Sequence, residues 1–188
     1  MSETSPDSSA VKAGCGRRSM LALVLGTGLA LPFGRHLAAQ TVDPRRQRPQ
    51  SGDRFVFADG ARQGQPIKLA DVPAGAKPVT AYPIDPASGT VRDDTRLNEV
   101  LLVRLDPASL TGETRARAAE GVVAYSAVGT HPGCDVGEWQ PAASTIRCSC
   151  HCAEFELSDG ARVVGGPAPR RLPALPLTIV DGAPAVAS

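Results

Sequence analysis

Two short stretches hold most of the chain's thiol and imidazole groups. The chain contains 5 cysteines and 3 histidines, and all but Cys15 and His36 lie in GTHPGC (129–134) and CSCHCAEF (148–155). Thiolates and imidazoles are the protein ligands that zinc and other soft or borderline metal ions prefer. The two stretches therefore predict one shared metal site. A tetrahedral zinc site is compatible with this pattern, with ligands drawn from His131, Cys134, Cys148, Cys150 and His151.

Other reactive patterns are missing from the sequence. It has no nucleophile paired with a base, no pair of carboxylates with an evident acid and base role, and no phosphate-binding loop. We therefore expect the chain not to catalyse a reaction by itself.

The segments around the two stretches have the character of short strands. Residues 97–105 (LNEVLLVRL) and 121–128 (GVVAYSAV) are apolar runs, and the second leads directly into GTHPGC. Aromatic residues are scarce, whereas Gly (19) and Pro (17) are frequent, which favours strands joined by many turns. We predict an all-β, mostly antiparallel fold. One short helix is expected from Asp106-Pro107 to Gly121, with Asp as its N-cap.

The charge of the chain gives no reason to expect a nucleic-acid partner. The full chain has 20 basic and 19 acidic groups, of which residues 1–39 contribute four basic and two acidic ones. The remainder therefore has 16 basic and 17 acidic groups. Such a balance lacks the basic excess typical of nucleic-acid binding.

The first 39 residues have the order of a secretory signal. Arg17-Arg18 stands before an apolar run, and small residues follow up to Ala39. The paired arginines predict a twin-arginine signal, with a general secretory signal as the alternative. We expect export to the periplasm, an oxidising compartment, and association with the membrane if the segment is retained. Residues 40–53 are predicted to form a linker before a domain at 54–182.

The two stretches together resemble the boxes of the Rieske iron-sulfur family, C-x-H-x-G-C and C-x-C-H. This resemblance implies a [2Fe-2S] cluster. By position, Cys148 would bind one iron, and His131 and His151 would bind the other. Cys134 and Cys150 match the cysteines that in many members form a disulfide between the two loops.

A third segment, GGPAPRRLPALPL (165–177), resembles the proline loop of the same family. The resemblance then implies a Rieske-like β-sandwich whose cluster-binding subdomain consists of two loops and this proline loop.

The chain departs from the family pattern at Gly129, which occupies the position of the first cysteine ligand. Glycine has no side-chain donor, so the cluster would lack one of its four protein bonds. Cys152 follows His151 directly. In extended backbone, neighbouring side chains point to opposite sides, so we expect the Cys152 thiol to face away from the site.

The resemblance implies a role in electron transfer. The chain is similar to small exported Rieske subunits of molybdenum oxidases, such as arsenite oxidase, or of cytochrome complexes. It would pass electrons between a catalytic partner, such as a molybdenum oxidase large subunit, and a cytochrome or other carrier. Two alternatives remain open: a cluster-free structural or assembly subunit, and a zinc- or thiol-based sensor.

Overall fold

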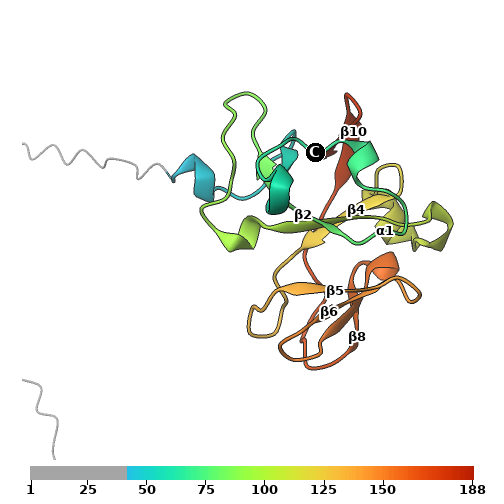
Figure 1. Ribbon diagram of the computed structural model, residues 1–188. Coiled ribbons are helices and arrows are strands. Elements are labelled where there is room, and N and C mark those ends of the chain that lie inside the picture. Colours follow the sequence, from blue (N-terminus) through green and yellow to red (C-terminus); the bar gives the residue numbers. More distant parts are fainter. Residues whose placement is uncertain (1–41) are drawn as a thin grey trace, which may run out of the picture. The chain divides into compact units, whose positions relative to one another are not determined.

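The computed structural model describes residues 42–188. The predicted signal segment 1–39, with Arg17-Arg18, Cys15 and His36, lies outside the described residues. Figure 1 shows two β-sheets and very little helix. The strands are β1 (Arg54–Phe57), β2 (Val79–Ile84), β3 (Val100–Arg104), β4 (Val122–Ser126), β5 (Val136–Gln140), β6 (Thr145–Cys148), β7 (Glu154–Glu156), β8 (Arg162–Gly165), β9 (Ala174–Leu175), β10 (Leu177–Val180) and β11 (Ala183–Val186). The helical elements are α1 (Gly112–Arg117) and the short 3-10 helices η1 (Pro44–Arg46), η2 (Gly60–Arg62), η3 (Leu69–Asp71), η4 (Arg96–Asn98), η5 (Pro107–Ser109) and η6 (Leu157–Asp159).

The larger sheet has the strand order β10-β11-β1-β2-β3-β4-β9, and the smaller one has the order β5-β6-β7-β8. Neighbouring strands pair antiparallel throughout both sheets. The predicted all-β, mostly antiparallel fold is therefore confirmed.

Strands β3 and β4 are neighbours in the larger sheet and are buried on both faces. Along β3, Leu101 and Val103 belong to one hydrophobic cluster, whereas Leu102 belongs to a second cluster on the opposite face. Successive side chains of a strand point to opposite faces, so a strand covered on both sides needs an unbroken apolar run. Burial on both faces therefore explains why residues 97–105 and 121–128, where strands were predicted, are continuous apolar runs.

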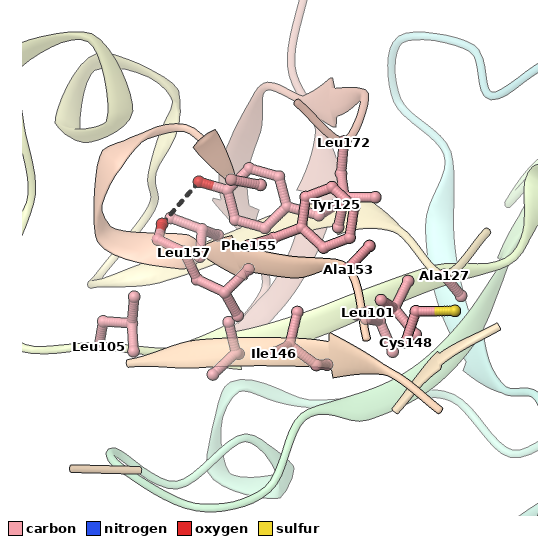
Figure 2. Packing of buried hydrophobic residues seen from close by; sticks show 14 of the residues in the cluster. Leu101, Leu105, Tyr125, Ala127, Ile146, Cys148, Ala153, Phe155, Leu157 and Leu172 are labelled. Atoms are coloured by element: carbon pink, nitrogen blue, oxygen red, sulfur yellow. Dashed lines mark hydrogen bonds between the residues drawn. The ribbon is translucent and has the colours of Figure 1, made fainter. Parts of the chain in front are cut away.

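The smaller sheet covers one face of the larger sheet through a shared hydrophobic cluster. Ile146 of β6 and Phe155 of β7 are fully buried in it, together with residues of β3 and β4. Figure 2 shows these side chains packed between the sheets, with Cys148 at the edge of the cluster near Leu101 and Ala127. The first cysteine of the second box is thus part of the hydrophobic core.

Tyr125 on β4 connects the two layers by a hydrogen bond. Its ring is 2% exposed, and its hydroxyl donates to the backbone carbonyl of Leu157 at 2.8 Å (Figure 2). Burial raises the pKa of Tyr125 to about 12, because ionisation would place a charge in the core. The hydroxyl stays protonated and remains a donor at neutral pH.

The prediction of one helix from Asp106 to Gly121 is wrong: the structure has two short helices in this segment. Asp106 is an N-cap, since its Oδ1 accepts from the backbone N–H of Ala108 at 2.9 Å, but the helix it begins is η5 and ends at Ser109. Leu110 then adopts an extended conformation and is 4% exposed in the core. A second helix, α1, begins at Gly112. Two extended residues, Leu110 and Thr111, therefore separate the two helices, and Leu110 packs in the core there.

The described part of the predicted linker contacts the connection between β2 and β3. Asp53 is buried and accepts from Arg92 at 2.6 Å (Nε to Oδ2) and 3.0 Å (Nη2 to Oδ1). Arg92 also donates to the carbonyl oxygen of Pro44 at 3.1 Å.

Beyond residue 182, strand β11 pairs with both β10 and β1. Within residues 42–188, no helix is long and apolar enough to cross a membrane.

Candidate metal centre

The first box forms the loop between β4 and β5. The backbone N–H of Gly129 donates to the carbonyl of Cys134 at 2.8 Å, and Val128 forms a β-bridge with Asp135. Gly133 has a φ of 81°, in the left-handed region that glycine adopts without strain. The loop is therefore a closed turn that holds His131 at its tip.

An ion pair supports this turn from the side of η4. The guanidinium of Arg96 donates to the carbonyl of Gly133 at 2.7 Å and pairs with the carboxylate of Asp135. Burial raises the pKa of the nearby Glu99, and the negative charge of Asp135 raises it further. Glu99, close to the first box, therefore keeps its proton to a higher pH than an ordinary glutamate does.

The second box forms the loop between β6 and β7. Cys148 donates its backbone N–H to the carbonyl of Ala153 at 2.8 Å, and its own carbonyl accepts from the N–H of Cys152 at 3.0 Å. Cys152 has a φ of 56°, which reverses the chain after His151. The Cys152 side chain is exposed. The cause is this left-handed turn and not the alternation of an extended strand.

The third segment, 165–177, lies against both boxes. Thr130 donates its hydroxyl to the carbonyl of Arg170 at 2.5 Å. A Cβ on Gly166 would stand 2.5 Å from the carbonyl oxygen of Cys152 and 2.6 Å from the Cα of Ala153. Because real Cβ atoms do not approach so closely, only glycine permits this contact at residue 166. The predicted grouping of two loops and a proline loop is present.

The structure brings the predicted site residues together. Cys134 and Cys150 form a disulfide between the two box loops, with a Cα–Cα distance of 6.4 Å. The rings of His131 and His151 meet edge to face, with centroids 4.9 Å apart. The thiol of Cys148 is free and 3% exposed, whereas both histidines are exposed. The centre therefore has a buried thiol at its base and two imidazoles at its surface.

Within residues 42–188, one compact group of potential metal ligands has its ligand atoms within 4.8 Å of one another. This group consists of Cys134, Cys148, Cys150 and His151. His131 lies beside the group through its contact with His151, and Cys152 is not a member. The sequence predicted one shared site from these residue types, and the structure places four of its five candidate zinc ligands in this compact group.

Residue 129 supplies no donor to the centre. A Cβ built on Gly129 would meet the carbonyl oxygen of Cys134 at 3.0 Å, and its φ lies outside the left-handed region. The backbone conformation therefore does not require glycine, although a side chain would need a small shift of the neighbouring carbonyl. The residues present offer two imidazoles and one thiolate to a cluster that takes two of each.

Comparison with known protein families identifies this centre. The Rieske [2Fe-2S] domain model matches residues 89–176, which include both boxes and most of the third segment. The cytochrome bc1 complex Rieske iron-sulfur subunit of Streptomyces lividans is 32% identical over 123 residues, covering 62% of this chain and 70% of that protein. A protein of Haloferax mediterranei named "Putative respiratory nitrate reductase subunit Rieske" is 38% identical over 133 residues, covering 70% of this chain and 55% of that protein.

Among solved structures, the plasma membrane Rieske protein of the cyanobacterium Synechocystis PCC 6803 matches with a TM-score of 0.42 and 24% identity, covering 64% of this chain and 95% of that one. The share of the bc1 subunit that the chain spans varies with the relative: it is 70% for the Streptomyces lividans protein and 34% for the Streptomyces coelicolor protein.

Proposed function

Because the chain belongs to the Rieske [2Fe-2S] family, we propose that it serves as the electron-transfer subunit of a larger redox complex. Its relatives are named as Rieske subunits of cytochrome bc1 complexes and of a nitrate reductase. The observation that carries the proposal is the placement of the donors. His131 and His151 lie together at the surface, and the Cys148 thiol lies beneath them in the core.

The donors fit one iron of the cluster completely and the other in part. His131 and His151 would hold the histidine iron, and Cys148 would hold the other iron by one thiolate. When bound, a cluster of this kind carries one electron at a time, at a reduction potential raised by the imidazole ligands. With Gly129 in place of the second thiolate, we propose that the protein holds it by three bonds and therefore less tightly.

The surrounding residues position these donors. The disulfide between Cys134 and Cys150 joins the two loop tips, so neither histidine can move far from the other. Gly166 allows the third segment to contact the second box closely. The exposed surface around His131 and His151 is the proposed docking face for a redox partner. We propose that the protein passes electrons between two kinds of partner. One is a catalytic subunit, such as the large subunit of a molybdenum oxidase, and the other is a cytochrome.

We also propose that the protein acts in the periplasm after export by the twin-arginine route. The disulfide supports this location, because such bonds persist in oxidising compartments. A route that exports folded proteins would allow a metal centre to be assembled before export.

A cluster-free role as a structural or assembly subunit is the second candidate, and Gly129 is the observation that favours it. One experiment separates the two. The full chain is expressed with its leader and purified without oxygen, and its iron, sulfide and low-temperature EPR signal after reduction are measured. Two irons and two sulfides per chain with an imidazole-ligated signal support electron transfer. Cys148→Ser and His131→Ala should each abolish the signal, whereas Cys152→Ser should keep it. If the wild-type protein holds no iron or sulfide, the electron-transfer proposal fails.

A further inference from the structure

We propose that reduction of the Cys134–Cys150 disulfide opens a second kind of metal site in the same loops. The site would be a tetrahedral zinc site formed by Cys134, Cys148, Cys150 and His151. The ligand atoms of these four residues already lie within 4.8 Å of one another. This is the Cys₃His set that structural zinc sites use.

The distances are close to those that zinc requires. Zn–S bonds of about 2.3 Å in a tetrahedral site place two sulfurs about 3.8 Å apart. The Sγ of Cys134 is 3.9 Å from the Nδ1 of His151. The widest separation in the group, at most 4.8 Å, exceeds the tetrahedral spacing by about 1 Å. Because Cys150 and His151 are exposed, their side chains can rotate to close this difference without moving the core.

Two of the four donors are available only after the disulfide is reduced. Reduction breaks one S–S bond, consumes two electrons and two protons, and yields two thiols. A dithiol of the thioredoxin class would supply both electrons and become a disulfide itself. Zinc then binds the deprotonated cysteines, and the three thiols release their protons to the solvent.

The donor count determines which metal centre each redox state favours. With the disulfide formed, the loops offer three donors to a cluster, namely Cys148, His131 and His151. With the disulfide reduced, they offer four donors to zinc, and neither residue 129 nor His131 is needed. Both centres use Cys148 and His151, so they exclude each other. This inference goes beyond electron transfer and does not depend on the cluster being bound.

The test uses the full chain in its metal-free form, oxidised or reduced with a phosphine that does not bind zinc. Co²⁺ is added as a spectroscopic probe, and zinc affinity is measured by competition with a coloured chelator. We expect one Co²⁺ per reduced chain, a strong thiolate-to-cobalt charge-transfer band, and displacement by zinc. The oxidised chain should bind zinc at least about 100-fold more weakly, because two thiolates are lost.

Variants distinguish this site from other thiol chemistry. Cys134→Ser and Cys150→Ser should each weaken zinc binding by the reduced chain and reduce the charge-transfer band, with folding checked by circular dichroism. Cys152→Ser is the matched control and should bind zinc as the wild type does. His131→Ala should also keep zinc binding, although it removes a proposed cluster ligand. The inference is overturned if reduction does not change zinc affinity, or if Cys152→Ser or His131→Ala abolishes binding. Because no iron is present, neither result depends on the outcome of the cluster assay.

Discussion

Replacing Gly129 with cysteine should rebuild the ligand set of the cluster. The substitution adds a thiolate at the position where the family pattern has its first cysteine. Loss of a group that merely orients a metal ligand commonly lowers metal affinity 10–100-fold. Gain of a direct ligand should therefore slow cluster loss by about 100-fold or more.

The structural cost of this substitution is small. Residue 129 does not have a left-handed φ, so a side chain introduces no backbone strain there. The new Cβ would lie 3.0 Å from the carbonyl oxygen of Cys134, which must move by a few tenths of an ångström. Tight packing of this kind costs about 1 kcal/mol of the free energy of unfolding.

The assay compares Gly129→Cys with Gly129→Ser, which adds the same Cβ but a poor ligand for iron. Iron and sulfide per chain are measured after anaerobic purification, and the rate of iron release to a chelator is followed by absorbance. Cysteine should raise occupancy and slow release, whereas serine should not. The reasoning is refuted if serine matches cysteine, or if cysteine leaves both quantities at the wild-type level.

Three further predictions concern the free energy of unfolding of the metal-free, disulfide-bonded protein. Tyr125→Phe should lower it by about 1–2 kcal/mol, because the buried carbonyl of Leu157 loses its donor; urea unfolding measures this, and an unchanged midpoint contradicts it. Arg92→Ala should cost about 3 kcal/mol or more, since Asp53 would stay buried without its counter-ion, whereas Arg45→Ala, at an exposed pair, should lower the free energy of unfolding far less. The raised folded-state pKa of Glu99 means that the folded protein binds this proton more tightly than the unfolded chain. The resulting stability is present below the ordinary pKa near 4.5 and is lost as pH rises through the raised value; Glu99→Gln should flatten this decline, and equal slopes for variant and wild type would exclude it.

The strands next to the site could be predicted from sequence because their burial leaves a simple pattern. Val122 and Val123 lie on opposite faces of β4 and are both buried, so the apolar run is continuous. The helix after Asp106 could not be bounded in the same way. The interruption depends on a pocket for Leu110 that exists only after the sheets have packed.

The contacts of the N-terminal segment were also beyond sequence reasoning. Asp53 and Arg92 form a buried pair although 39 positions separate them, and neither residue has neighbours that signal burial. At the metal centre, the boxes predicted His131 and Cys148 as donors from their positions in the sequence. The contact between the two histidine rings depends on the closure of separate loops. Spacing along the chain does not describe that closure.

The double burial of β4 has a consequence for how the protein fluctuates. Its backbone amides should be among the slowest in the chain to exchange with deuterium, because their exposure requires the two sheets to separate. The loop that carries His131 begins directly after this strand, and its exposed tip at His131 and Pro132 belongs to neither hydrophobic cluster. Its amides can therefore open by a local motion that leaves the sheets intact. Metal exchange and disulfide reduction at the tip are then separate events from global unfolding, and each can occur many times during the lifetime of one folded molecule.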